Sequence, residues 1–364
     1  MMRRWLVVLT CAALLGCDGA QAPAPAGFAG LGSEAQGFSA VTRGETLVFP
    51  ADFAAHPGYR IEWWYVTANL TDERGEQWGA QWTLFRQAMA PQSTAEAQAG
   101  WHSAQVWLGH AALTRADGHR HADRLARGGI GQAGVRAQPF QAWIDDWSLS
   151  GNAALQLSPL QLSPLRVSAA GEGFSYDLNL QASAPLVLHG DRGFSQKSER
   201  GQASWYYSQP FFQVDGTVHW QGEERRVSGM AWLDREWSSQ PLAADQQGWD
   251  WFSLHLQDGS KLMLFRLRSN TDQHFYSGTW ITADGVAEPL DQSAIVMTPL
   301  QETEVAGRSL PIRWRLQIAH KDFDVTAQAL NKNAWMDTGI PYWEGPVNVA
   351  GSHTAVGYLE MTGY

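Results

Sequence analysis

The chain has very little cysteine. Only two of its 364 residues are Cys, and both Cys11 and Cys17 lie in the first 17 residues. If those residues act as an export signal, the mature chain keeps no thiol for a disulfide or a catalytic thiolate. Positive charge is also scarce, because 26 Lys and Arg stand against 36 Asp and Glu, a formal net charge of −10. This balance gives no electrostatic signature for nucleic acid, so we expect no nucleic-acid partner.

Motifs of several common site types are missing as well. The chain has no Gly-x-Ser-x-Gly, so a hydrolase of that type lacks its nucleophile elbow. No glycine-rich phosphate-binding motif falls on a strand-to-helix turn. His119 and His121 form a His-x-His within RADGHRHADR, but a solvated hairpin tip accounts for this run and no distant third ligand is evident. We therefore predict no metal and no cofactor.

The first 17 residues carry the features of an export signal. Arg3 and Arg4 give a positive start, and the apolar run that follows is too short to span a bilayer stably. The run ends in Leu14-Leu15-Gly16-Cys17, which resembles the lipobox of bacterial lipoproteins, where the peptide is cut before a cysteine that is then acylated. An ordinary secretory signal is the alternative. The resemblance implies a lipid anchor on Cys17 at the periplasmic face of a membrane, and Asp18 slightly favours the inner membrane.

The rest of the chain is predicted to form a tether followed by β-strands. Residues 18–44 are rich in Ala, Pro and Gly over their first part, which is typical of a flexible tether. From about Val41 onward, short alternating runs rich in Val, Leu, Trp, Tyr and Phe are separated by Asp-Gly turn pairs. No long segment shows a helical period. The sequence therefore predicts an all-β fold.

Four landmarks occur twice in the same order. EWWYVTANL, from Glu62, leads to QWTLFR ending at Arg86, and DWFSLHL, from Asp250, leads to KLMLFR ending at Arg266. YYSQP followed by AWLDRE in the first half matches YWEGP followed by GYLEMT in the second. This repeat predicts two tandem antiparallel β-barrel domains, over residues 45–240 and 245–364. Each is long enough for roughly eight strands around one small ligand.

Segments along nearly the whole mature chain are similar to one known family. They are FPADFAAHPGYRIEWWYVTANL, GAQWTLFRQAM, LHGDRGFSQKS, GMAWLDREWSSQPL, GWDWFSLHLQDGSKLMLFRLR and YWEGPVNVAGSHTAVGYLEMTGY. These segments resemble the lipocalin-like family that includes carotenoid 1,2-hydratases and AttH-like secreted proteins, often labelled "predicted secreted hydrolase". The resemblance implies two lipocalin-like barrels with an apolar ligand site. The family holds hydratases, pericyclases and proteins of unknown activity, some encoded beside ABC transporters, so the reaction stays open.

The hydratases of this family show a His-x-Trp strand and then a Tyr-x-Asp strand, with the Asp as proton donor. Trp205 and Tyr207 stand at the first pair of positions here, and Trp232 and Asp234 at the second. The chain keeps the Asp and departs at the other three positions. The resemblance thus implies Asp234 as a general acid, with Trp232 beside it.

Strand geometry groups these residues further. Residues two apart on a strand share a face, so Trp232, Asp234 and Glu236 lie together. If the two strands pair, we expect Trp205 and Tyr207 to meet these acids across the sheet. Apolar burial and a neighbouring carboxylate raise the pKa of an acid, which suits Asp234 to protonating an alkene. Aromatic faces stabilise the carbocation that forms.

A structural role for the acids is the alternative. Asp234 and Glu236 then hold the junction between the barrels by pairing with Lys197, Arg200 or Arg235.

The repeat favours this structural role. Glu360 recurs at the position of Asp234 in the second half, and an acid present in both halves is typical of scaffold. Glu62 and Asp250, which lead the Trp-rich strands, are expected to pair with backbone or with Arg86 and Arg266.

Three functions remain on sequence alone. The first is binding of an apolar ligand (isoprenoid, polyene or lipid-like) by a monomeric, lipid-anchored protein linked to an ABC transporter. The second is a lyase resembling carotenoid 1,2-hydratase, with Asp234 as general acid. The third is a secreted hydrolase, for which Ser195 and Lys197 are the nearest candidates. We favour the first because it needs the fewest special residues. The predicted ligand-binding residues are Trp64, Trp205, Tyr207 and Glu236.

Overall fold

The computed structural model describes residues 27–364, apart from 94–95, 97–99, 152–155, 158–159 and 272. Strands dominate this part of the chain, which confirms the all-β prediction. No helix in these ranges is long and apolar enough to cross a membrane. The predicted signal peptide (1–17), its Cys17 and the first part of the predicted tether (18–26) lie outside the described residues. The short 3-10 turns are η1 (Phe28–Gly30), η2 (Ala51–Phe53), η3 (Gly100–His102), η4 (Gln292–Ala294) and η5 (Ala319–Lys321).

The first sheet has 13 strands within the described residues, each antiparallel to its neighbours. Along its main path the order is β4 (Gly118–Arg127), β3 (Gln105–Arg115), β2 (Gln77–Ala88), β1 (Ile61–Asp72), β15 (Glu223–Ser238), β14 (Ala203–Trp220), β11 (Phe174–Ala182), β10 (Leu165–Gly171), β7 (Trp147–Gly151), β6 (Phe140–Ile144) and β5 (Ala133–Ala137). Off this path, β12 (Val187–Leu188) and β13 (Phe194–Gln196) pair with β14.

The second sheet has ten strands in the same part of the structure. Its order is β19 (Ala287–Leu290), β18 (Phe275–Ile281), β17 (Lys261–Ser269), β16 (Gln246–Leu256), β25 (Ala355–Met361), β24 (Tyr342–Gly351), β22 (Phe323–Ala329), β21 (Arg308–Ile318) and β20 (Ile295–Val305), with β23 (Trp335–Met336) paired to β24. A separate hairpin joins β8 (Gln156–Leu157) to β9 (Leu160–Gln161).

The two sheets repeat one strand order. The path β3-β2-β1-β15-β14-β11-β10 of the first sheet matches β18-β17-β16-β25-β24-β22-β21 of the second. The duplicated sequence landmarks fall on matched strands, since EWWYVTANL forms β1 and DWFSLHL forms β16. Both sheets hold more strands than the roughly eight that the repeat length suggested. The structure therefore confirms the internal repeat at the level of topology.

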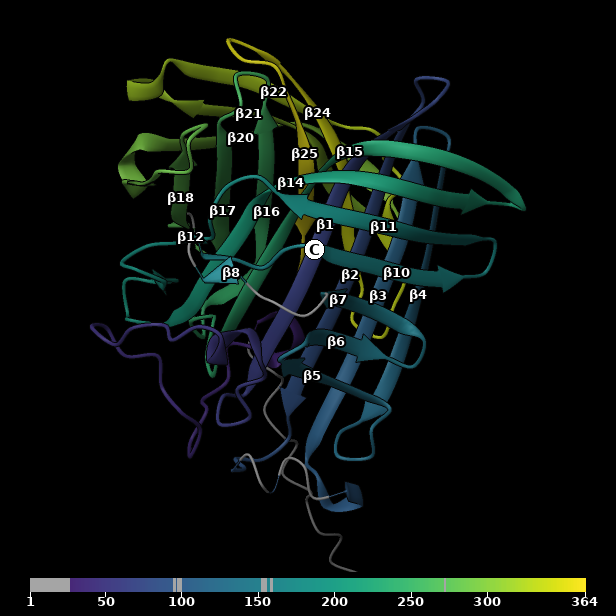
Figure 1. Cartoon of the computed structure of the whole chain (residues 1–364). Coiled ribbons are helices and arrows are strands. Elements are labelled where there is room, and N and C mark those ends of the chain that lie inside the picture. Colours follow the sequence, from purple (N-terminus) through teal and green to yellow (C-terminus); the bar gives the residue numbers. More distant parts are fainter. Residues whose placement is uncertain (1–26, 94–95, 97–99, 152–155, 158–159, 272) are drawn as a thin grey trace, which may run out of the picture.

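Each sheet curls around its own apolar core, and we call the two units the first and the second barrel (Figure 1). Trp64, Trp82 and Trp147 are among the large side chains that fill the first core. Trp314 and Trp343 occupy the second. Indole rings of this size leave the barrel interiors packed with protein side chains.

A third apolar cluster, which we call the seam, joins the two barrels. Its buried members are Leu31, Ile61, Tyr65, Ala184, Val187, Tyr206, Phe211, Trp232, Leu242, Trp251, Met263, Phe265, Leu267, Ile281 and Tyr358. Polar bonds cross beside it, because the Asn69 amide donates to the carbonyl of Gly357 at 2.9 Å. Gly79 allows close approach, since a Cβ at that position would lie 2.6 Å from Pro346. The barrels thus pack tightly face to face.

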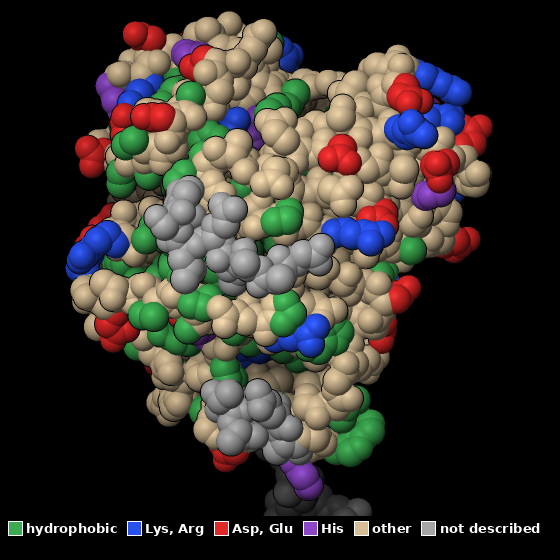
Figure 2. Space-filling view, in the orientation of Figure 1, with side chains coloured by type: hydrophobic (Ala, Val, Ile, Leu, Met, Phe, Trp, Pro, Cys, Tyr) green, Lys and Arg blue, Asp and Glu red, His purple; other side chains and the backbone are tan. Residues whose placement is uncertain are grey.

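Charged side chains have two distinct settings. On the face shown in Figure 2, acidic and basic side chains are interspersed around the surface. Inside the first barrel, Glu62 is fully buried and its carboxylate binds both Arg86 and Arg235. Its counterpart Asp250 accepts a 2.8 Å hydrogen bond from Arg266. The predicted pairing of the strand-leading acids with Arg86 and Arg266 is therefore confirmed.

The described part of the predicted tether lies against the body of the molecule. Arg60 donates to the carbonyl oxygens of Leu31 at 3.0 Å and Ser33 at 3.1 Å. Gln240 donates to the carbonyl oxygen of Gly32, and the Leu31 side chain is buried in the seam. Residues 28–33 are therefore fixed in place beside the junction of the barrels.

Candidate functional site

A pocket with a mostly apolar lining lies in the seam, between the two barrels. It is a cavity of about 110 Å³ with walls from both sheets, and we call it the seam pocket. The first sheet contributes β1, β2, β3, β14 and β15, and the second contributes β16, β17, β24 and β25. An apolar cavity of roughly 150 Å³ accepts a ligand the size of benzene, so this one suits a small apolar group.

Strands with two buried faces create this pocket. On β15, Leu233 and Trp237 belong to the core of the first barrel, whereas Trp232 belongs to the seam. Asp234 and Glu236 share the face of Trp232 and line the pocket. An acid on an apolar strand is therefore explained by the second barrel, which covers a face that would otherwise meet water.

The expectation that Trp205 and Tyr207 meet the acids across the sheet is wrong by one residue. In the β14–β15 register, Tyr206 and Ser208 stand opposite the two acids instead. Side chains alternate along a strand, so a shift of one residue moves a side chain to the other face. Trp205, Tyr207 and Trp64 all pack into the core of the first barrel and do not line the pocket. Tyr206 lines the pocket in their place.

Asp234 is held by three donors. The Trp232 indole donates to its Oδ1 at 2.6 Å, the Ser208 hydroxyl donates to the same oxygen, and the Tyr206 hydroxyl donates to Oδ2 at 3.0 Å. Trp251 of the second barrel donates to the Tyr206 oxygen at 3.1 Å. The Trp232 ring packs in the seam and does not line the pocket, so its link to the pocket is this hydrogen bond to Asp234.

Burial dominates the titration of this carboxyl group. It raises the pKa of Asp234 to about 7, although hydrogen bonds from Ser208, Trp232 and Tyr206 lower the value. The negative charge of Glu236 raises it further. Near neutral pH, Asp234 therefore exists in both protonation states, which is what a general acid or base requires.

Glu360 is the second acid of the site, and sequence reasoning assigned it to scaffold. It lies on β25, the strand that matches β15 in the repeat, and it lines the same pocket. Trp249 donates to its Oε1. Burial raises the pKa of Glu360 to about 7, and the charges of Asp234 and Glu236 raise it too. The sequence repeat was the signal that could have placed Glu360 in the site, because the matched strands β15 and β25 form facing walls of the pocket and bring their matched acids together.

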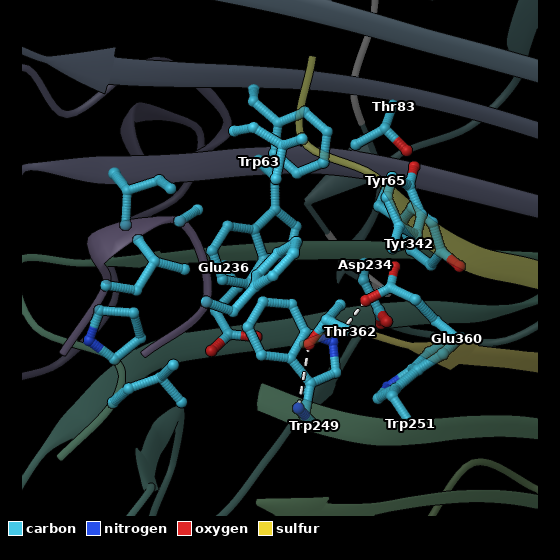
Figure 3. Close-up of a pocket in the computed structure, with 18 of the residues that line it drawn as sticks. Trp63, Tyr65, Thr83, Asp234, Glu236, Trp249, Trp251, Tyr342, Glu360 and Thr362 are labelled. Carbon is cyan, nitrogen blue, oxygen red and sulfur yellow. Dashed lines mark hydrogen bonds between the residues drawn. The ribbon is translucent and has the colours of Figure 1, made fainter. Parts of the chain in front are cut away.

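The polar groups of the pocket gather at one end. Figure 3 shows Tyr65, Tyr342, Asp234 and Glu360 together on one side of the cavity. Tyr65 donates to the buried Glu344, whose second oxygen has no hydrogen-bond partner among the described residues. Burial and the nearby Glu360 hold the pKa of Glu344 well above its usual range. This end of the pocket thus brings together phenols and acids whose pKa values are raised by burial.

Glu236 has a different partner. Its carboxylate forms a 2.8 Å ion pair with Lys197, whose ammonium also lies over the rings of Tyr206 and Phe265. Lys197 was one of three predicted partners of the acids. Ser195, its proposed partner in hydrolysis, does not line the pocket.

A chain of hydrogen bonds runs from Asp234 through Ser208 to His189, and the sequence did not predict it. His189 meets Ser208 at 2.7 Å through Nε2 and Thr279 of the second barrel at 2.8 Å through Nδ1. Burial lowers the pKa of His189 to about 3, so the ring is neutral. Because Ser208 donates to Asp234, it accepts from His189, which fixes the proton of the imidazole on Nε2. The motif LHGDRGF gave no hint of this contact, since it depends on β18 of the other barrel.

Asp234→Asn is expected to change how stability depends on pH. A raised carboxyl pKa means that the folded state holds the proton more tightly, so the stabilisation is complete below the ordinary pKa of 3.8 and is lost as pH rises through about 7. Each unit of pKa difference corresponds to about 1.4 kcal/mol. Urea unfolding at several pH values measures the slope. An unchanged slope between wild type and Asp234→Asn contradicts the assignment.

These observations define the class of the protein: it is a lipocalin-like protein of two barrels with an apolar pocket at their seam. The family model described as AttH-like matches residues 40–364, and the chain belongs to this family.

Several solved structures resemble the chain, and two of them are as follows. The crystal structure of an AttH protein from Nitrosomonas europaea is 32% identical with a TM-score of 0.78, and the match covers 90% of this chain and 99% of that one. The crystal structure of kievitone hydratase from Nectria haematococca shares the fold at 15% identity and a TM-score of 0.64, over 93% of this chain and 98% of that one. No curated protein matches the chain.

Proposed function

We propose that the protein binds an apolar molecule with a carbon–carbon double bond in the seam pocket and adds water to that bond. One observation carries the proposal: Asp234, with its pKa raised to about 7, lines a largely apolar cavity that is rich in aromatic side chains. The fold neighbour from Nectria haematococca is named a hydratase, which agrees with this chemistry.

The reaction balances with the groups present. Asp234 gives its proton to one alkene carbon, and the electron pair of the π bond forms the new C–H bond. The adjacent carbon becomes cationic, and the indole faces of Trp63 and Trp251 stabilise it. Water adds there and loses a proton to the Glu360 carboxylate. That proton then returns to Asp234, a transfer between two groups of similar pKa.

The apolar end of the pocket selects the ligand. Phe28, Phe85 and Leu267 line it, and neither charge nor amide groups are needed to hold one small apolar end of an isoprenoid or polyene chain there. A lipid anchor on Cys17, if present, keeps the pocket close to the membrane where such molecules dissolve, on the periplasmic side. A neighbouring ABC transporter is a suitable source or acceptor of the ligand.

Binding without chemistry is the second candidate. Asp234 already accepts three hydrogen bonds from its own chain, and Glu236 is paired with Lys197. Acids satisfied in this way can serve only to join the barrels, leaving the pocket as a ligand carrier.

Incubation in heavy water separates the two. The purified protein is given prenylated and polyene substrates in D₂O, and the products are analysed by mass spectrometry. Hydration places one deuterium on carbon and adds one water to the mass. Ligand uptake with no such product in any substrate of the panel contradicts the hydratase and supports the carrier.

A further inference from the structure

An apolar row leads from the seam pocket to the outer edge of the first barrel. Trp63 on β1, Phe85 on β2, Leu108 on β3 and Leu125 on β4 stand directly opposite one another on successive strands. Residues opposite one another share a face of the sheet. The first three line the pocket, whereas Leu125 is 67% exposed on the edge strand. The row therefore carries the apolar wall of the pocket out to the surface.

Two more large apolar side chains are exposed close to this edge. Met89 directly follows β2 and is 67% exposed. Trp101, in η3 between β2 and β3, is 72% exposed. A 2.8 Å hydrogen bond from the Met89 amide to the Ala104 carbonyl closes this connection beside the ends of both strands. Three of the seven large apolar side chains that are exposed in the described part of the chain, Met89, Trp101 and Leu125, thus lie on or beside the neighbouring strands β2, β3 and β4, and we call them the apolar edge. A gathering of exposed apolar side chains marks an interaction surface.

The N-terminal segment arrives at the same pocket. Phe28 and Ala29 line it, and the Phe28 ring packs edge-on against Trp249 at a centroid distance of 5.3 Å. Gly27 lies only ten positions after Cys17, a length of chain that reaches at most about 35 Å when extended. A lipid on Cys17 thus holds the seam pocket within that distance of a bilayer.

We propose that the apolar edge docks on a phospholipid bilayer, so that an apolar ligand moves between bilayer and seam pocket along the apolar row. Leu, Met and Trp side chains gain from entering the boundary of headgroups and acyl chains in proportion to the apolar area they bury. The indole of Trp101 suits this boundary because it combines an apolar ring with a polar N–H. This inference rests on lipidation of Cys17 and on the seam pocket as the ligand site, and it is independent of the chemistry of Asp234.

A thiol-directed probe tests the docking on the lipidated full-length protein in phosphatidylethanolamine–phosphatidylglycerol vesicles. The mature chain offers no thiol besides the acylated Cys17, so Leu125→Cys can be labelled alone with an environment-sensitive fluorophore. We expect its emission to shift to the blue and to be quenched by nitroxide lipids. The matched control is Leu300→Cys on β20, a 47% exposed residue at the edge of the second barrel, which should show neither effect.

Two results overturn the proposal. Equal, water-like emission at both sites means that the apolar edge stays in solution. A blue shift that depends on protein concentration and not on lipid means that a second copy of the chain covers the edge.

Ligand transfer gives an independent readout. Quenching of protein tryptophan by a polyene measures uptake, first from vesicles and then from detergent micelles. Leu125→Ser is expected to slow uptake from vesicles by roughly tenfold, the scale of withdrawing one leucine from apolar contact, with uptake from micelles unchanged. Equal slowing from both sources contradicts a bilayer route. Loss of hydration in Asp234→Asn with normal uptake tests the proposed reaction separately.

Discussion

Asp234→Asn is expected to lower the rate of water addition by roughly 10²–10⁴-fold while ligand affinity changes little. The amide keeps the shape of the side chain but has no proton to give to a carbon atom. Both Asp234 oxygens accept hydrogen bonds now, so the amide nitrogen will face one donor, and circular dichroism must confirm that the variant folds. Single-turnover rates and equilibrium ligand binding, measured on one preparation, separate chemistry from affinity.

Asp324→Asn is the matched control. Asp324 lies exposed on β22 of the second barrel, where it pairs with Arg315 at 2.7 Å, far in sequence and role from the seam pocket. The rate of water addition by Asp324→Asn should equal that of the wild type. Turnover that survives in Asp234→Asn refutes the general acid. A wild type that binds the ligand and never forms product refutes hydration itself.

The pH dependence of the same reaction follows from the raised pKa. Asp234 must be protonated and Glu360 must be ionised to act, so the rate should be highest near pH 7, falling at lower pH as Glu360 is protonated and at higher pH as Asp234 ionises. The pKa values read from the pH–rate profile belong to Asp234 and Glu360 as a pair, because the charges of the two acids influence each other. A rate that keeps rising as the pH increases above 7 would contradict an acid as the first proton donor.

Glu62→Gln is expected to cost about 3–5 kcal/mol of unfolding free energy, the typical loss when one partner of a buried ion pair is removed. Glu62 is completely buried, and its carboxylate binds Arg86 and Arg235 inside the first barrel. The glutamine leaves both guanidinium groups without a counter-charge in an apolar interior. Asp324→Asn, which breaks an exposed pair, should cost only about 0–1 kcal/mol.

The dependence of stability on low pH tests the same buried ion pairs of Glu62. Burial alone would raise the pKa of Glu62, but Arg86 and Arg235 lower it strongly, and the net shift is downward. A lowered carboxyl pKa contributes stability at pH values above the ordinary one and loses it as pH falls. Wild type should therefore lose stability below about pH 4–5 more steeply than Glu62→Gln. Urea midpoints over this range, with equal m-values, make the comparison. Parallel curves would show that the ion pair does not stabilise the fold.

The candidate site shows how far sequence reasoning reached. The alternation in GMAWLDREW placed Asp234 and Glu236 on one face, and the structure puts both in the seam pocket. The prediction for the partner strand was wrong by one residue and therefore chose its other face. Nothing in the local sequence determines which residue of YYSQP stands opposite Asp234. That choice depends on the β14–β15 register, which brings Tyr206 and Ser208 to the acids.

The sequence alone could not place Glu360 and His189 in the candidate site, for a related reason. Glu360 is 126 positions from Asp234, and His189 reaches it through Ser208 while its other nitrogen contacts Thr279 of the second barrel. Such groups meet only because two barrels pack face to face. A repeat in the sequence reveals matched strands, yet it does not say which of their faces meet.

The sequence by itself determined the strands, the duplication and the buried acid–arginine pairs, because alternation and cross-strand pairing act between neighbours on one sheet. Tertiary structure decided where the hollow lies. Each barrel fills its interior with indole rings, so the cavity forms between them, at the faces of β1, β15, β16 and β25 that the partner barrel covers. Removal of those faces from water is what raises the pKa of Asp234 and Glu360, and no single strand contains that information.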